Sequence, residues 1–592
     1  MNRALKSKII MFVSMMLFMI FYMVIFGSKN AVIGMMVVMA AFMNLSNDLS
    51  FKPKSSFIKI LLLLLVLGIA SFLNNPLTIF GCILTFVVVF ATTFTSYNLF
   101  GTHVYLPYLM IYFMMVGIPV SVEMLPMRLL SLVFGAVFIV GLNMAINRKK
   151  DYKLSKATID MLISELDKAI DLKLDGKDVF SDNFRTINGF YLSIFNRSEY
   201  KYFPSEIHKS VLNVVKSFQY IGKIISEHDL SNKELLYIRS VLSQIKQIDL
   251  EDIFDGIEIE SKVMYLVLLN LEIISNEIRK DLTDEIMLPD KNTLKTQFKS
   301  LIRQYFSFRS AKFTFAFKMA FLMFVWQLLT LMFNLPFTKW LYFATISLML
   351  PYINDVAYSA KSRLQGTFIG VFVFAAILII VPYLNVSFNV ISVAVMVVCM
   401  FIMVIKLEDK LILTIVTTVI SVMTALMYIP PPEAMELKIL WVTVAVVVVT
   451  LFNYKFLPYS VEIETKNNLK TSYMLNQQSI DLVKQKCMAT GPDKKTTLLV
   501  LSNVVRENIE ITEENRELYA LQVKITDICN FILNYLDLIP ISDDLAKNLV
   551  EIIDDNALAD VNLNIKDKIL AYSMEHVMSL FNDEQRIIEG FD

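Results

Sequence analysis

The chain has 592 residues, of which 56% are hydrophobic, and its 55 basic and 55 acidic side chains give a formal net charge of zero. This composition excludes an ordinary soluble globular protein, and the balanced charge gives no support to nucleic-acid binding. Four cysteines lie far apart without the spacing of a metal or redox motif, and they are Cys82, Cys399, Cys487 and Cys529. No cofactor or metal is expected from the sequence.

Apolar residues concentrate in two stretches, 8–146 and 313–456. A membrane span needs about 20 mostly apolar residues, so each stretch is long enough for six. The predicted spans are 8–27, 31–46, 57–73, 77–98, 102–120 and 124–146, followed by 313–335, 340–353, 362–382, 385–405, 409–428 and 434–456. The first span lacks a small-residue cleavage site, so we expect it to remain as an anchor.

The second span is predicted to be the short one in each stretch. Short segments at matching positions of two halves often mark a transport path. The alternative interpretation is a tilted or loosely bounded helix.

Each apolar stretch is followed by a polar one, 149–310 and 459–592, with ordinary polar composition and helical periodicity. Ile159, Leu162 and Leu166 repeat at three and four residues, which indicates one buried helix face. Neither stretch contains a phosphate-binding or dinucleotide-binding glycine motif, so we predict no enzyme. The predicted domains are 1–148, 149–310, 311–458 and 459–592.

Lysines and arginines are distributed unequally between alternate loops, which predicts the orientation in the membrane. Positive charges precede the first span, follow the second and follow the sixth. The matching loops of the second stretch carry Lys361, Arg363, Lys406 and Lys410. This pattern places both termini and both polar stretches in the cytoplasm.

The chain also contains an internal similarity. Residues 47–55 and 354–362 align without a gap and share an Asn-Asp pair, an aromatic residue, a lysine and a serine at the same spacing. Internal repeats of this kind indicate a duplicated architecture.

A second pair of positions supports the duplication. Arg128 and Asn143 are fifteen residues apart, and Lys438 and Asn453 have the same separation. An even number of spans separates the copies, so the two six-helix repeats are predicted to be parallel. The predicted fold class is therefore an all-α polytopic membrane protein, with two parallel six-helix transmembrane repeats, each followed by a cytoplasmic helical domain.

The sequence from Arg363 to Gly370, RLQGTFIG, reads as R-x-x-G-T-x-x-G at the start of a predicted span. This motif, with Trp340 and Pro351 around the preceding span, resembles the fusaric acid resistance and aromatic acid exporter superfamily of bacterial inner-membrane proteins. In the first half the motif is replaced by Ser56, Lys59 and other residues. The resemblance implies export of small aromatic or organic acids, with a periplasmic adaptor protein in some members.

Several cations are candidates for binding an organic anion. Lys361, Arg363 and Lys54 lie at predicted cytoplasmic ends of spans, where a guanidinium can bind a carboxylate at two points. Arg128 and Lys438 lie at predicted periplasmic ends, where they are candidates for an exit site. The alternative is that all five orient or anchor their helices in the membrane.

The Asn-Asp corners carry the candidate coupling residues, which are Asn47, Asp48, Asn354 and Asp355. Carboxylates at membrane depth are costly and usually functional, although each aspartate could instead cap the following helix. Thr367 lies between Gly366 and Gly370, and the two glycines form a small face suited to close helix packing.

Together these features predict a secondary efflux transporter for small, partly hydrophobic or aromatic organic acids. The proton gradient or the membrane potential would drive it, because no nucleotide site is visible. A membrane scaffold with working cytoplasmic domains and an anion channel are the alternatives. The expected partners are the organic anion, the lipid bilayer, a periplasmic adaptor and a second copy of the chain, with no nucleic acid.

Overall fold

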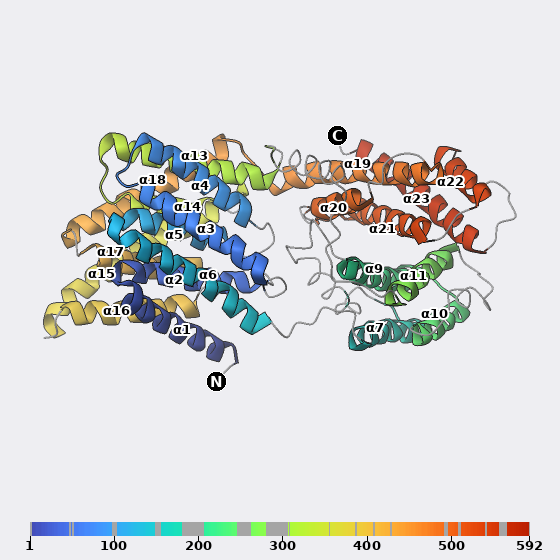
Figure 1. The fold of residues 1–592 in the computed structure, drawn as a ribbon, viewed down its shortest axis with the longest axis horizontal. Coiled ribbons are helices and arrows are strands. Elements are labelled where there is room, and N and C mark those ends of the chain that lie inside the picture. Colours follow the sequence, from blue (N-terminus) through green and yellow to red (C-terminus); the bar gives the residue numbers. More distant parts are fainter. Residues whose placement is uncertain are drawn as a thin grey trace. The chain divides into compact units, whose positions relative to one another are not determined.

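The computed structural model divides the chain into two compact units. Unit 1 comprises residues 1–149 and 304–464, and unit 2 comprises residues 150–303 and 465–592. The residues that the structure describes are 3–46, 49, 53–97, 104–147, 156–179, 187, 206–245, 262–279, 306, 308, 310–353, 356–384, 388–406, 409–426, 429–489, 495–506, 509, 511–538, 542–555 and 565–590. Within them, every regular element is a helix (Figure 1).

The first stretch of unit 1, called here the first half, contains six α-helices. They are α1 (Arg3–Phe26), α2 (Ser28–Met43), α3 (Pro53–Leu73), α4 (Ile79–Ser96), α5 (Tyr105–Gly117) and α6 (Leu125–Asn147). The second stretch, called the second half, contains six more. They are α13 (Ala311–Phe333), α14 (Lys339–Leu348), α15 (Val356–Ile380), α16 (Phe388–Ile405), α17 (Lys410–Ala425) and α18 (Pro431–Lys455).

These helices match the twelve predicted spans in order. Six segments of the described chain are long and apolar enough to cross a membrane, namely Pro53–Leu73, Ile79–Ser96, Val122–Ile146, Ala311–Phe333, Val356–Ile380 and Pro431–Lys455. Shorter apolar segments of 10–17 described residues lie in α1, α2, α5, α16 and α17. The second helix is the shortest one only in the second half, where α14 has 10 residues. In the first half α5, with 13 residues, is shorter than α2, with 16. Helix α5 ends early because Ile118 precedes Pro119, and a residue before proline disfavours helical geometry.

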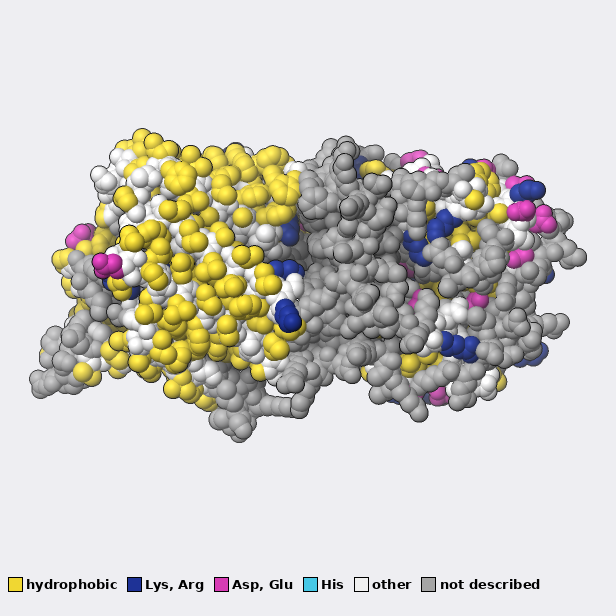
Figure 2. Space-filling view, viewed as in Figure 1, with side chains coloured by type: hydrophobic (Ala, Val, Ile, Leu, Met, Phe, Trp, Pro, Cys, Tyr) yellow, Lys and Arg dark blue, Asp and Glu magenta, His cyan; other side chains and the backbone are white. Residues whose placement is uncertain are grey.

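The surface of unit 1 is apolar where a soluble protein would be polar. On α3, Ile58, Leu62, Val66 and Ile69 are about half exposed and lie along one side of the helix. Figure 2 shows hydrophobic side chains covering the face of unit 1 that it presents. An apolar surface of this extent fits contact with lipid, so unit 1 is a multi-pass membrane unit.

The two halves pack against each other through two equivalent pairs of helices. The first helix of each half contacts the fourth helix of the other, α1 on α16 and α13 on α4 (Figure 1). Aromatic rings line both contacts. The ring centroids of Phe12 and Phe401 are 5.2 Å apart, and those of Phe90 and Phe313 are 5.6 Å apart. Aromatic contacts at these distances stabilise a packed interface beyond the area that they bury.

Unit 2 is a helical bundle drawn from both polar stretches. The first contributes α7 (Lys156–Leu174), α9 (Glu206–Glu227), α10 (Asn232–Gln244) and α11 (Lys262–Arg279). The second contributes α19 (Val461–Cys487), which begins in unit 1, and α20 (Lys495–Arg506), α21 (Arg516–Leu538), α22 (Asp543–Asp555) and α23 (Ile565–Glu589). One hydrophobic core includes residues of both stretches, and α11 contacts α21 and α23.

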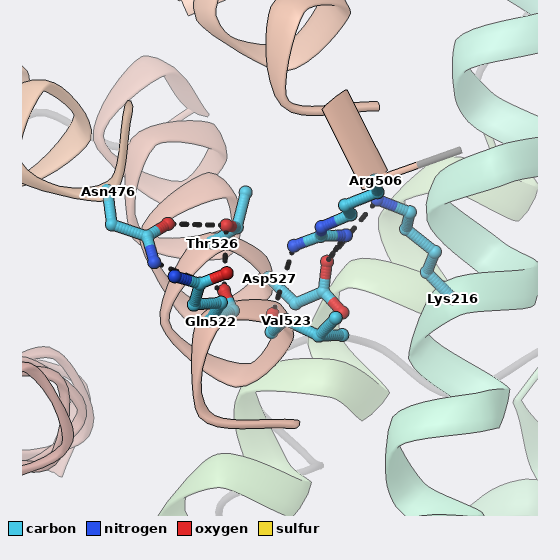
Figure 3. Close-up of polar contacts among 7 residues, drawn as sticks. All are labelled: Lys216, Asn476, Arg506, Gln522, Val523, Thr526 and Asp527. Atoms are coloured by element: carbon cyan, nitrogen blue, oxygen red, sulfur yellow. Dashed lines mark hydrogen bonds and ion pairs between the residues drawn. The ribbon is translucent and has the colours of Figure 1, made fainter. Parts of the chain in front are cut away.

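A buried ion triad also joins the two stretches of unit 2 (Figure 3). The carboxylate of Asp527 on α21 lies 3.3 Å from the Lys216 ammonium on α9 and 3.2 Å from the Arg506 guanidinium on α20. Burial opposes ionisation of Asp527, but the two positive charges outweigh it and lower the pKa of the carboxyl group below its ordinary value. The two predicted cytoplasmic stretches therefore fold together.

Candidate functional site

Helix α15 approaches α17 closely at the glycines of the R-x-x-G-T-x-x-G motif. A Cβ atom built on Gly366 would lie 2.6 Å from Thr414 Cβ and 3.1 Å from the Leu411 carbonyl oxygen. One built on Gly370 would lie 2.8 Å from the Ile415 carbonyl oxygen. These distances are too short for a side chain, so the glycines are what allow the two backbones to come together.

Arg363 and Thr367 lie one helical turn apart on α15. Thr367 is only 2% exposed, and its hydroxyl has no hydrogen-bond partner among the described residues. Threonines in apolar helices usually bond the carbonyl four residues back, as Thr414 does to Lys410 at 2.8 Å. Arg363 is half-buried, and its enclosed Nε also lacks a partner in the described part of the chain. Two neighbouring polar groups on α15 therefore have no hydrogen-bond partner within the described chain.

Lys438 on α18 lies near this pair. Its side chain is 5% exposed, and its Nζ lies 5.3 Å from the centroid of the Trp340 ring at the start of α14. The positive charges of Arg363 and Lys339 are close enough to act on the Lys438 ammonium. Helices α14, α15 and α18 contact one another pairwise. We call Arg363, Thr367, Lys438 and Trp340 the cationic cluster.

The cationic cluster has no acidic counterpart in the described residues. Neither Arg363 nor Lys438 forms an ion pair with any aspartate or glutamate of that part of the chain. A buried, unpaired charge costs several kcal/mol (order of magnitude), and cation–π attraction to a tryptophan contributes only about 2 kcal/mol when desolvated.

Arg128, the predicted counterpart of Lys438, has hydrogen-bond partners for its guanidinium group. Its Nε donates to Asn30 Oδ1 at 3.0 Å, and its other nitrogens donate to the carbonyl oxygens of Ile118 at 2.8 Å and Lys29 at 3.3 Å. The guanidinium thus bridges the start of α2 and the chain after α5 with neutral acceptors. This bonding accounts for the burial of Arg128 as a structural cross-link.

The other predicted site residues are dispersed. Lys54 on α3 and Lys361 on α15 are exposed. Asn47, Asp48, Asn354 and Asp355, which form the two Asn-Asp corners, lie outside the described residues.

The chain next to each corner is held to the end of a helix. In the first half the backbone N–H of Leu49 donates to Asn143 Oδ1 on α6 at 3.0 Å. In the second half the N–H of Ile353 donates to the carbonyl oxygen of Tyr459, beyond α18, at 3.2 Å.

One further polar group was not expected from the sequence. Glu464, in the first turn of α19, is 5% exposed and accepts a hydrogen bond of 2.5 Å from the hydroxyl of Tyr352. Burial raises the pKa of this carboxyl group to about 7. Acidic residues are common in the first turn of a helix, and Glu464 occupies such a position. The sequence around Glu464 therefore does not distinguish it from an ordinary exposed glutamate.

Comparison with known proteins gives one family match. Residues 319–452 match the family described as fusaric acid resistance protein-like. This range runs from α13 to α18 and contains all four residues of the cationic cluster. It confirms the resemblance drawn from the motif between Arg363 and Gly370. No curated protein and no solved structure is significantly similar to the chain.

Proposed function

We propose that the protein is a secondary transporter that exports small, partly hydrophobic organic acids across the bacterial inner membrane. The observation that carries this proposal is the proximity of half-buried Arg363 to buried Lys438, with no acidic partner for either among the described residues. Ionisable groups inside a membrane protein are costly and usually functional. A carboxylate arriving there would supply the missing negative charge.

The chemistry of the cluster fits an aromatic or apolar carboxylate. A guanidinium binds a carboxylate through two parallel hydrogen bonds, and the Thr367 hydroxyl can donate a third. The Trp340 ring offers an apolar face beside the ammonium of Lys438. The family description, fusaric acid resistance, agrees with removal of an organic acid from the cell.

The helix arrangement supports two parallel repeats as the framework. The α1–α16 and α13–α4 contacts pair equivalent helices of the two halves, as is expected of two repeats related by a two-fold axis along the membrane normal. The distribution of lysines and arginines then places both termini and unit 2 in the cytoplasm. The motif occurs in the second half, where the described residues also include a buried lysine, Lys438, without an acidic partner among them, so we assign substrate binding to this half. A purely scaffolding membrane unit would gain nothing from such a lysine.

Efflux from proteoliposomes tests the proposal. Benzoate is the probe, and benzamide, which has the same ring without the charge, is the control ligand. The full chain should accelerate benzoate efflux well above that of empty vesicles and leave benzamide efflux unchanged. Equal acceleration of both compounds, or of neither, would contradict an anion transporter.

A further inference from the structure

A second polar cluster in unit 1 surrounds Glu464. Tyr352 follows α14, Tyr97 follows α4, and Tyr459 lies between α18 and α19. All three hydroxyls interact electrostatically with one another or with the Glu464 carboxylate. The cluster thus joins the first half, through Tyr97, to the second half and to the start of α19.

Among the described residues, the groups that stabilise the Glu464 carboxylate are neutral. Tyr352 donates its hydroxyl hydrogen, and the backbone N–H of Ala311, at the start of α13, also favours the ionised carboxylate. In the described chain Glu464 forms no ion pair with a lysine, arginine or histidine. Lys318 on α13 donates instead to the carbonyl oxygen of Leu457 at 3.3 Å. An ionised carboxylate buried with neutral donors alone is poorly stabilised, so uptake of a proton is favoured.

The surroundings also provide a place for the added proton. Tyr97 is buried, and its hydroxyl lies beside the hydroxyl of Tyr352 and near the Glu464 carboxylate. The oxygen of a phenol can accept one hydrogen bond as well as donate one. A protonated Glu464 can therefore donate to a tyrosine oxygen while Tyr352 still donates to the other carboxyl oxygen. Both protonation states of Glu464 then have hydrogen-bond partners in the same cluster.

The position of Glu464 connects it to the elements that carry the cationic cluster. The carbonyl of Tyr459 accepts the backbone hydrogen bond of Ile353, just before the Asn354–Asp355 corner and α15. A change of charge at Glu464 acts on the hydroxyl of Tyr352, the residue before Ile353. It therefore acts close to the start of the helix that bears Arg363.

We propose that Glu464 is a proton-binding site that takes up and releases one proton in each transport cycle. Tyr352 and Tyr97 are its hydrogen-bonding partners. The proton passes between water and a carboxyl oxygen, and no other bond forms or breaks. The link to transport rests on the proposed export function, whereas the proton site itself can be tested without a substrate.

The direct test is infrared spectroscopy of the reconstituted full chain during a pH titration. The C=O stretching band of a protonated carboxylic acid should disappear as the pH rises through neutrality, because burial raises the pKa of Glu464 to about 7. Glu464→Gln should lose this component, and exposed Glu462→Gln should retain it. Burial also raises the pKa of Glu584 in unit 2 to about 7, so Glu584→Gln serves to assign its separate contribution.

A milder variant keeps the test valid if Glu464→Gln disturbs folding. Tyr352→Phe removes the hydrogen bond that favours the ionised carboxylate, so the midpoint of the Glu464 band should shift to higher pH. A band that is unchanged by both Glu464→Gln and Tyr352→Phe would overturn the proton site.

Transport then distinguishes the two proposals. With benzoate as the probe, Glu464→Gln should lose the pH dependence of the wild-type efflux, whereas exposed Glu462→Gln should keep it. A wild-type pH profile in Glu464→Gln would overturn coupling at this site. No benzoate efflux by the wild type, with the infrared band assigned to Glu464, would contradict the export function and leave the proton site standing.

Discussion

The ammonium of Lys438 lies 5.3 Å from the centre of the Trp340 ring and forms no ion pair within the described residues. The ring faces the charge as a cation–π partner, which offsets only part of the cost of burying an ammonium. The positive charge of Arg363 raises that cost further, because like charges repel. This arrangement is unfavourable for stability alone, and the predictions below follow from it and from the packing around it.

Replacing Lys438 by methionine should separate stability from function. Lys438→Met removes an uncompensated buried charge at similar volume, so the melting temperature should stay the same or rise. Benzoate efflux should fall at least about tenfold, which corresponds to about 1.4 kcal/mol of lost binding. Exposed Lys361→Met on α15 is the control and should export normally. Normal export by Lys438→Met would remove this lysine from the site.

Arg363→Lys tests the planar shape of the guanidinium. Lysine keeps the positive charge but cannot bind a carboxylate at two points, so half-maximal benzoate efflux should require about tenfold more substrate. If Arg363 only orients α15 in the membrane, the lysine variant should export like the wild type. Equal amounts of the wild type and of Arg363→Lys in the membrane fraction would show that the substitution does not impair membrane insertion.

The glycines of α15 should be sensitive to a single added carbon. Gly370→Ala places a Cβ atom 2.8 Å from the Ile415 carbonyl oxygen, so we expect destabilisation of about 1–3 kcal/mol from the enforced separation of α15 and α17. Gly141→Ala on α6 is the matched control, because no heavy atom lies within 4 Å of its Cβ position. That variant should be neutral or slightly stabilising, since alanine favours helix more than glycine does. Thermal unfolding that is equal in the two variants would contradict close packing at Gly370.

The ion triad of unit 2 should respond to pH and to loss of its carboxylate. Asp527→Asn leaves Lys216 and Arg506 without their shared partner, so we expect a loss of about 3–5 kcal/mol. Asp171→Asn, which breaks a more exposed contact with Arg239, should cost at most about 1 kcal/mol.

The direction of the pH effect follows from the lowered pKa of Asp527. Its contribution to stability is present above the ordinary carboxyl pKa and is lost as the pH falls through the lowered pKa of the folded state. Acid unfolding of the wild type should therefore be steeper than that of Asp527→Asn. Identical acid profiles would show that the triad does not control this range.

Topology can be tested with an impermeant thiol reagent in cells, on a background that lacks the native cysteines. A cysteine at Glu433, exposed at the start of α18, should react from outside. A cysteine at Lys177, exposed in unit 2, should be protected until the membrane is permeabilised. Reaction of Lys177→Cys in intact cells would reverse the orientation derived from the positive charges.

Much of the membrane unit could be predicted from sequence. The thickness of a bilayer sets the number of consecutive apolar residues that a span needs, and such runs can be read directly from the sequence. The twelve helices therefore appear in the expected order. The packing of these helices depends on contacts between residues that are distant in sequence. The contacts of α1 with α16 and of α13 with α4 were therefore not predicted. The same reason explains why the two polar stretches were not expected to share the core of unit 2.

The candidate site was only partly predictable. Arg363 and Lys438 were both identified as anion-binding candidates, but their places in the helix order put them at opposite ends of the membrane. The structure brings their charges together, because α15 and α18 are in contact and both side chains are long. Glu464 was missed because its burial arises from Tyr97, Tyr352 and Tyr459, which come from distant parts of the chain.

Equilibrium binding of radiolabelled benzoate to the purified full chain tests the cationic cluster most directly. Wild type and Lys438→Met would be compared at one pH and one ionic strength, with unlabelled benzamide as a competitor. An anion site at Arg363 and Lys438 predicts saturable binding to the wild type, at least about tenfold weaker binding to Lys438→Met, and no competition by benzamide. Equal benzoate affinity in the two proteins, or equal competition by benzamide, would contradict the site.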